Sequence, residues 1–418
     1  MRPFALALVL ILVSVTVVGC WDSVELEKRA IVAGAGVDKA DGPGLLRVTV
    51  QTIRAAAVKP ESSSKAGSQP AVTVFSGTGY SIGDATANLR MVIGKTIFQT
   101  ETEVVVMGEA LARESIDRVI DFYERNREPS RRLYLLIAKS KAREVLETEV
   151  STNRIWAFGI GALAKSAASY GKAPSVELGQ FLAAIESKTT APVIAGVEVI
   201  QTGESQGATE TGAAVPSKEV KVSGTAVFQK YRLIGWLDET ETRGMLWIAG
   251  KVQCGVIVIP TPGQPDSPVA VSVTRASSEI IPEVGPDGIP SITVRVKAEG
   301  GVETMADERD LTQPAVIRQL EAQEGAAIEL EVSAALATAR ALNADVFGFG
   351  EAIHRKFPKE WRRLEPEWDS VFPPLEVNVV VEVKIRHTGT VNKPPTTTIR
   401  RTSGFATKQS APFRLRAS

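Results

Sequence analysis

The chain has little of the material from which enzyme active sites and metal sites are usually built. Its 418 residues include two cysteines, Cys20 and Cys254, and two histidines, His354 and His387. Two cysteines allow at most one disulfide. With so few cysteines and histidines, the chain has little of the side-chain material that zinc sites, thiol chemistry or a Ser-His-Asp triad require. The sequence therefore weighs against an enzyme, and it predicts no metal or other cofactor bound by the folded chain.

An excess of charge is also absent. Lysine and arginine total 48, as do aspartate and glutamate, so the formal net charge is zero. No overall field attracts nucleic acid or an acidic substrate, and no nucleic-acid partner is expected. Hydrophobic residues make up 44% of the chain and charged residues 23%, which is typical of a globular protein with a buried core. The length predicts two or three domains.

Long apolar runs are missing except at the N-terminus. Residues 4–18 form an uncharged apolar run after Arg2, but at about fifteen residues it is shorter than the roughly 20 of a membrane-spanning helix. The run ends in Val-Val-Gly followed by Cys20, which is the pattern of a bacterial lipobox. Residues 1–19 are therefore predicted to be a lipoprotein signal peptide.

A lipobox cysteine becomes the new N-terminus and carries covalent diacylglycerol and an N-acyl chain. Each buried CH₂ contributes roughly 0.8 kcal/mol, and a second chain makes membrane attachment stable. The alternatives are an uncleaved signal anchor and ordinary secretion with cleavage nearby. Neither explains a cysteine directly after Gly19 at the end of the apolar run. The expected molecule is a soluble body tethered to a membrane surface through Cys20.

Beyond the signal peptide, strand patterns alternate with helix patterns, which indicates a mixed α/β layer architecture. Residues 20–201 are predicted to form an N-terminal α/β domain that begins with a strand at Arg29–Lys39 and contains helices at Ser81–Gly94 and Glu109–Glu128. The polar, Gly- and Thr-rich residues 202–221 are predicted to be a linker.

Residues 222–390 are predicted to form a C-terminal α+β domain. It contains a long helix from Pro314 to about Leu342 and a last strand within Leu375–Gly389. Residues 391–418 contain six basic residues and no acidic one, and they are expected to be a disordered basic tail. That tail is interpreted as a solubilising segment, with attraction to anionic lipid headgroups as the alternative.

The glycine-rich, cysteine, histidine and tryptophan motifs of the chain offer little chemistry. Neither glycine-rich stretch, Gly34–Gly44 or Gly348–Arg355, has the strand–loop–helix context of a nucleotide-binding loop. Cys254 is expected to be a small core residue, and His354 a surface or capping residue. Trp361 and Trp368 are expected to pack against the long helix. The alternative for this pair is a partner-binding patch, because Trp is frequent at interface hot spots.

Three segments taken together resemble the Ger(x)C family, the C-subunit lipoproteins of bacterial spore germinant receptors. They are Gly19–Lys39, with Cys-Trp-Asp and Gly-x-Asp-Lys; Gly224–Val252, with Thr-Arg-Gly-x-x-Trp; and Asn343–Gly389, with Asp-x-Phe-Gly-Phe-Gly and two tryptophans. Their order and spacing carry the resemblance. The motif residues, possible partner contacts, are Trp21, Asp22, Arg243, Trp247, Asp345, Gly348, Gly350, Trp361 and Trp368.

The resemblance implies an α+β fold of mixed β-sheets flanked by α-helices, in about three subdomains. It also implies a non-catalytic, lipid-anchored receptor subunit on the outer face of the inner spore membrane, beside an A subunit and a transporter-like B subunit. Because the family's nutrient site is generally placed in the membrane partner, no small-molecule ligand residues are carried over. Cys20 is the one residue whose chemical role is carried over.

Two other functions remain open on the sequence. A lipid-anchored solute-binding protein would also be tethered, but its own ligand would stabilise it against heat. A cell-surface hydrolase would need a convergent acid/base cluster, and the sequence offers no obvious one.

Overall fold

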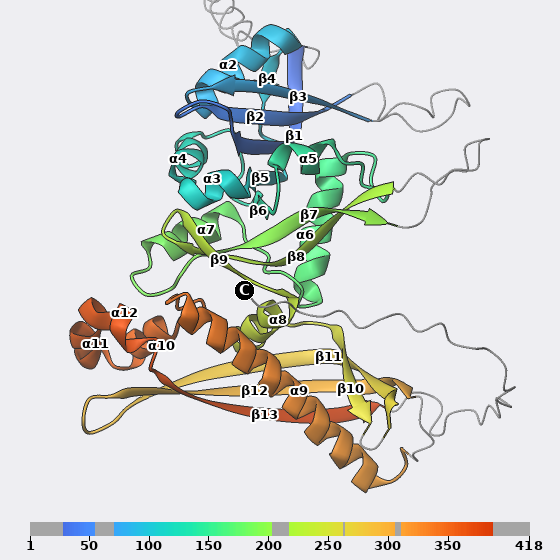
Figure 1. The fold of residues 1–418 in the computed structure, drawn as a ribbon, viewed down its shortest axis with the longest axis vertical. Coiled ribbons are helices and arrows are strands. Elements are labelled where there is room, and N and C mark those ends of the chain that lie inside the picture. The colour runs from blue at the N-terminus through green and yellow to red at the C-terminus, as the bar shows by residue number, and fades with distance from the viewer. Residues whose placement is uncertain (1–27, 55–70, 203–216, 262–263, 306–310, 388–418) are drawn as a thin grey trace, which may run out of the picture.

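The fold consists of two lobes stacked along the long axis of the molecule (Figure 1). Cys20, Trp21 and Asp22 lie outside the residues that the structure describes, as does the whole predicted tail at 391–418. The computed structural model describes residues 28–54, 71–202, 217–261, 264–305 and 311–387.

A mixed nine-stranded sheet forms the N-terminal lobe. The strands run in the order β3-β2-β1-β5-β6-β7-β8-β9, and the short β4 pairs with β1. The central strands β1, β5, β6 and β7 are parallel, and the outer pairs are antiparallel. Parallel strands covered on both faces are apolar throughout, as β5 shows. The bounds are β1 Arg29–Lys39, β2 Leu46–Ile53, β3 Val72–Gly79, β4 Thr96–Phe98, β5 Val104–Gly108, β6 Tyr134–Ala138, β7 Val193–Thr202, β8 Ser217–Gln229 and β9 Arg232–Leu237.

Helices cover both faces of this sheet, so each face has its own hydrophobic core. One face is covered by four helices: α2 (Ile82–Ile93), α3 (Glu109–Glu114), α4 (Asp117–Arg125) and α7 (Leu178–Glu186). The other face is covered by α5 (Ala142–Glu147) and α6 (Trp156–Ser169).

Local capping signals correctly predicted α2. Ser81 is its N-cap and accepts a hydrogen bond from the Asp84 N–H at 3.1 Å, while Gly94 ends the helix with a left-handed φ of 68°. The single helix predicted at Glu109–Glu128 is wrong, because Ser115 is extended and separates α3 from α4. The Ile116 N–H after the break bonds to the Tyr231 carbonyl at 2.9 Å, a contact that no local pattern encodes.

The predicted linker at 202–221 does not divide the fold. Strand β8 begins at Ser217 and pairs with β7 over its length, with Thr202 opposite Ser217 and Val193 opposite Val227. The segment between these strands therefore joins neighbours in one sheet, and β8 and β9 belong to the N-terminal lobe. The lobes separate after Leu237, where α8 begins.

A four-stranded sheet, β10-β11-β12-β13, forms the C-terminal lobe. Its neighbours are antiparallel except β12 and β13. The predicted long helix is confirmed as α9, and the mixed sheets with helices confirm the α+β class. The bounds are α8 Glu239–Ile248, β10 Gly255–Thr261, β11 Gln264–Val284, β12 Pro290–Met305, α9 Pro314–Ala341, α10 Phe349–Lys356, α11 Pro358–Leu364, a 3₁₀ turn at Glu365–Glu367, α12 Trp368–Val371 and β13 Glu376–His387.

Cys254 is not the core strand residue that the sequence predicted. It lies just before β10, is half-buried, and has its thiol 3.5 Å from the Ser169 carbonyl. Across the described parts of the chain, we found no helix with the length and apolar character needed to cross a bilayer.

Candidate functional site

Two of the three motif segments, Gly224–Val252 and Asn343–Gly389, meet where the two lobes join. The first is on α8, where Arg243 Nε donates to Glu331 Oε2 of α9 at 2.8 Å and Nη2 donates to Oε1. Trp247 Nε1 donates to the same Oε2 at 2.9 Å. Sequence reasoning singled out Arg243 and Trp247 but missed Glu331. The available signal was an acidic residue on the apolar face of α9, between Ile328 and Val332.

Gly244, between these two residues, brings α8 and α9 almost into backbone contact. A Cβ at Gly244 would lie 2.0 Å from the Glu331 carbonyl oxygen, which no side chain can tolerate. On the opposite side of α8, the hydroxyl of Thr242 lies 2.8 Å from that of Thr225 in β8. Helix α8 thus ties the first sheet to the long helix of the second lobe.

The Asp345 carboxylate organises the start of α10. Its Oδ1 accepts hydrogen bonds from the N–H groups of Phe347, Gly348 and Phe349 at 3.1, 2.9 and 3.1 Å, and Oδ2 accepts from Gly350 at 2.9 Å. Burial raises the pKa of Asp345 to about 6, although the four backbone donors act in the opposite direction. The side chain is fully committed to shaping this turn.

The same turn joins the lobes. The Ala191 N–H, in the loop before β7, donates to the Asp345 carbonyl at 2.8 Å. Gly348 has a φ of 76°, which favours glycine. A Cβ at Gly350 would lie 2.8 Å from Thr189 Cβ and 3.0 Å from Trp368 Cε2, so glycine here permits close contact between the lobes.

Trp361 and Trp368 are 2% and 4% exposed and belong to the C-terminal core that α9 also lines. Their ring centroids are 5.2 Å apart in an edge-to-face arrangement. Their burial contradicts the alternative of a surface patch for partners. His354, on α10, is half exposed and lies 5.9 Å from the Trp361 ring, consistent with the predicted surface position.

Asp38, in the Gly-x-Asp-Lys motif, has a similar structural role in the first lobe. It accepts hydrogen bonds from the N–H groups of Ala142 and Arg143 at 2.8 and 3.0 Å, at the start of α5. Burial raises its pKa, opposed by these two donors. The described motif residues are therefore engaged in packing and hydrogen bonding inside the protein.

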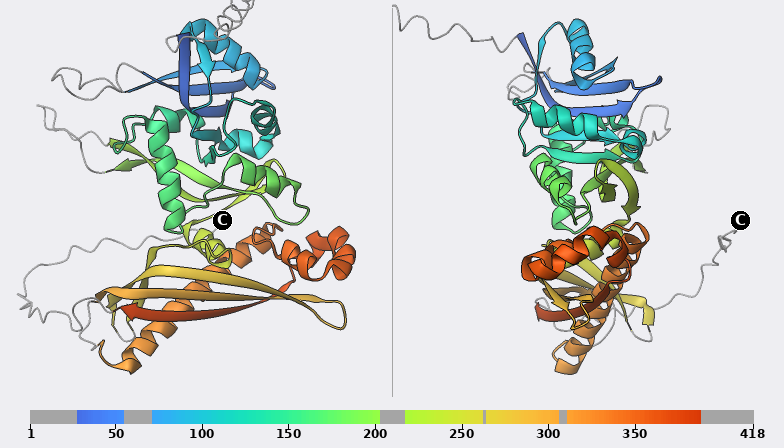
Figure 2. Two further views of the ribbon diagram at one scale, coloured as in Figure 1. Left: turned by 180° about the vertical axis from the view of Figure 1, so that it is seen from behind. Right: turned by 90° about the vertical axis from the view of Figure 1, so that its left-hand side faces the viewer.

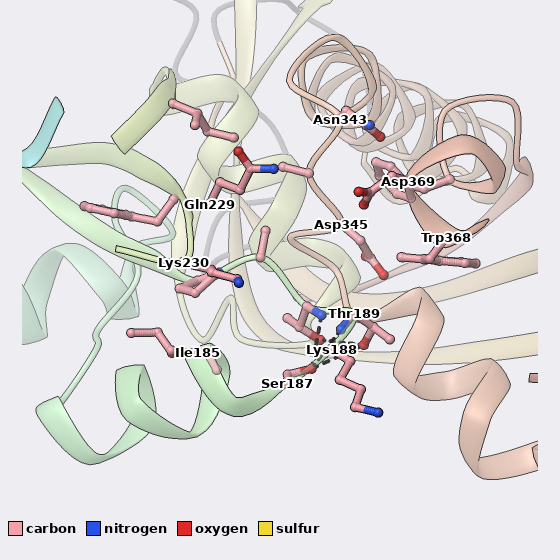
Figure 3. Close-up of a pocket in the computed structure, with 18 of the residues that line it drawn as sticks. Ile185, Ser187, Lys188, Thr189, Gln229, Lys230, Asn343, Asp345, Trp368 and Asp369 are labelled. Carbon is pink, nitrogen blue, oxygen red and sulfur yellow. Dashed lines mark hydrogen bonds between the residues drawn. The ribbon is translucent and has the colours of Figure 1, made fainter. Parts of the chain in front are cut away.

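A cavity of about 400 Å³ lies beside the Asp345 turn, between the lobes. Figure 3 shows Gln229 and Lys230 on the side of the first lobe, and Asn343, Asp345 and Asp369 on the side of the second. Trp368 also lines the cavity, and its buried indole N–H has no hydrogen-bond partner among the described residues. In the described ranges, this cavity included, no cluster of acidic, His or Cys side chains is arranged to hold a metal ion.

Comparison with known families explains why these motifs occur together. The family model described as spore germination protein N-terminal domain matches residues 22–199, and the model described as spore germination B3/GerAC like, C-terminal, matches residues 223–389. The chain belongs to this GerAC-like family of spore germination proteins. The two matches leave out residues 200–222, which include the end of β7 and the start of β8, although β8 and β9 complete the sheet of the first lobe.

Relatives in Bacillus subtilis (strain 168) match over nearly their whole length. The chain is 28% identical to spore germination protein KC over 94% of this chain and 98% of that protein. It is 25% identical to spore germination protein YndF over 93% of this chain and 98% of that protein. The crystal structure of the GerBC protein shares the fold, with a TM-score of 0.51 and 17% identity over 84% of this chain and 97% of that one.

Proposed function

We propose that this chain is the non-catalytic, lipid-anchored C subunit of a nutrient germinant receptor in the inner membrane of bacterial spores. The observation that carries the proposal is the match of both germination family models, in order, to residues 22–199 and 223–389. In this role the subunit lies on the outer face of the membrane beside A and B subunits and is required for germination.

The anchor in this proposal is Cys20, modified with diacylglycerol and an N-acyl chain. Its support is the apolar run that ends directly before the Gly19–Cys20 pair. Two or more acyl chains give stable attachment without a spanning helix. The subunit then acts through contacts with its membrane partners. Because its described motif side chains are used internally, docking is assigned to other, exposed surfaces.

Replacing the anchor residue tests this function. We expect Cys20→Ala to move the protein from the membrane fraction to the soluble fraction and to abolish the nutrient response of spores in which it is the sole copy. The reason is that removal of all acyl chains removes the main attachment energy. Fractionation with immunoblotting and optical-density loss of spores in nutrient measure the two effects.

Cys254→Ala is the matched control, because it removes the other cysteine and should leave location and germination unchanged. A Cys20→Ala protein that remained in the membrane fraction would mean that either the N-terminal apolar run or contacts with membrane partners suffice for attachment. Normal germination after complete deletion of the gene, in spores without related receptors, would refute the receptor role.

A second candidate, a solute-binding lipoprotein, is favoured by the cavity between the lobes. Lys230 and Asn343 line it, and they are the two non-glycine residues with positive φ in the described ranges, at 54° and 48°. Such strained backbone clusters at ligand sites. Lys230 from one lobe and Asp369 from the other supply opposite charges, which suits a small zwitterionic or polar solute.

Thermal-shift measurement separates the two candidates. If the cavity binds a solute, saturating amino acid, sugar or nucleoside raises the melting temperature, because a ligand at 100 times its Kd stabilises the folded state by about 2.7 kcal/mol. Lys230→Gly removes the ammonium and suits the positive φ, so it should keep the fold and lose the shift. No shift with any of these solutes contradicts the solute-binding candidate and leaves the receptor-subunit role.

A further inference from the structure

The end of α2 carries apolar side chains that no part of the described protein covers. Met91 is 88% exposed and Val92 is 71% exposed, in the last turn of the helix. The other face of α2 is buried through Ala85 and Leu89. Two adjacent, almost fully exposed apolar residues at a helix end form a candidate contact surface.

The chain start lies beside this surface. Strand β4 follows α2 after Lys95 and pairs in parallel with β1, so that Arg29 lies opposite Thr96. Paired strands are about 4.8 Å apart. The first described residue, Lys28, therefore lies close to the end of α2.

The tether from the predicted anchor is short. Cys20 precedes Lys28 by eight residues, and an extended chain spans at most about 3.6 Å per residue, or roughly 28 Å here. A lipidated Cys20 thus holds this end of the molecule within roughly 28 Å of the bilayer. In both views of Figure 2, α2 lies at the opposite end of the molecule from the C-terminal sheet.

Basic residues flank the apolar pair. Arg90 precedes Met91, and both Arg90 and Lys95 are exposed. Lys28 is exposed as well, at the start of the described chain. Each basic residue near an anionic membrane contributes about 1 kcal/mol of attraction. Apolar side chains surrounded by basic ones are typical of segments that lie in the membrane interface.

We propose that the tip formed by Lys28 and Arg90–Lys95 rests on the lipid bilayer, with Met91 and Val92 inserted among the headgroups. The proposal rests on the lipid anchor proposed at Cys20. It orients the molecule with its long axis away from the membrane, so that the C-terminal lobe projects outward. The tip binds anionic lipid in this proposal. The experiment below also detects the alternative, in which the same tip binds a protein partner.

The test places one environment-sensitive fluorophore on the tip. Met91→Cys in a Cys254→Ala background is labelled with a nitrobenzoxadiazole dye in the full lipidated protein, since Cys20 is blocked by its lipid. The protein is reconstituted alone into vesicles of phosphatidylethanolamine and phosphatidylglycerol. Leu330→Cys in the same background is the matched control, because Leu330 is 72% exposed and lies on α9 in the far lobe.

We expect the dye at position 91 to shift its emission to the blue and to lose fluorescence when the vesicles contain doxyl-labelled lipid, while the dye at position 330 is unaffected. Vesicle-bound protein with no quenching at 91, or with equal quenching at both positions, overturns the orientation and leaves the anchor intact. A blue shift at 91 only when A and B subunits are added, without lipid quenching, assigns the tip to a protein partner instead. Failure of the protein to bind vesicles overturns both the anchor and the orientation.

Discussion

Glu331→Ala is expected to lower the free energy of unfolding by about 3–5 kcal/mol, which is the usual cost of removing one partner of a buried ion pair. The side chains of Arg243 and Glu331 are only 15% and 9% exposed, so solvent screens the pair little. The change also leaves the Trp247 indole N–H without its acceptor. Because both groups lie where α8 meets α9, the junction of the lobes should loosen first.

Urea unfolding of the purified protein in mild detergent measures this effect. Glu329→Ala is the matched control: it removes an exposed glutamate from the same helix, and surface changes of this kind stay within about 0.5 kcal/mol. Glu331→Gln keeps an acceptor for Trp247 without the charge, so its loss should be intermediate. If the Glu331→Ala and Glu329→Ala proteins were equally stable, the bonds of Glu331 to Arg243 and Trp247 would contribute nothing to the free energy of unfolding.

The protein is expected to become less stable as the pH rises, because of the buried carboxyl group of Glu324. It is 1% exposed, its Oε2 has no hydrogen-bond partner in the described structure, and burial, together with the charge of Glu321, raises its pKa to about 7 from 4.5. Between pH 4.5 and about pH 7, Glu324 is ionised in the unfolded chain but still protonated in the folded chain. The free energy of unfolding therefore falls by about 1.4 kcal/mol per pH unit, or about 3 kcal/mol in all.

Glu324→Gln stays neutral at every pH, so it isolates this contribution from those of Asp38 and Asp345. The variant should match the parent near pH 4.5 and exceed it by up to about 3 kcal/mol above pH 7. Unfolding curves of both proteins, measured from pH 4.5 to 8, give the comparison. Parallel stability profiles would mean that Glu324 titrates normally in the folded protein.

Local patterns predicted much of the fold correctly because they act over a few residues. The alternating apolar run at Arg29–Lys39 is strand β1 with the expected bounds. Ser81 and Gly94 delimit α2, and Pro314 begins α9. Strand β13 lies within the predicted range Leu375–Gly389, and its Val377, Val379, Val381 and Val383 alternate with exposed neighbours.

Features that depend on contacts between residues far apart in the sequence could not be predicted from local patterns. The break at Ser115 accompanies a backbone bond to Tyr231, and the Arg243–Glu331 pair joins residues 88 positions apart. The junction of the lobes combines two motif segments, Gly224–Val252 and Asn343–Gly389, that are separate in the sequence. For the same reason, four motif residues that suggested partner contacts are buried, because aromatic and charged residues also suit an interior junction: Trp247, Asp345, Trp361 and Trp368.

The placement of β8 bears on how members of this family can be recombined. A hybrid protein joined between the two family segments would pair β7 of one parent with β8 of the other. All nine residue pairs between these strands would then join residues from different parents. Exchange after Leu237 would keep the whole first sheet from one parent. Hybrid proteins that exchange the C-terminal lobe are therefore best joined at the start of α8, where one helix, rather than a pair of strands, has to be matched.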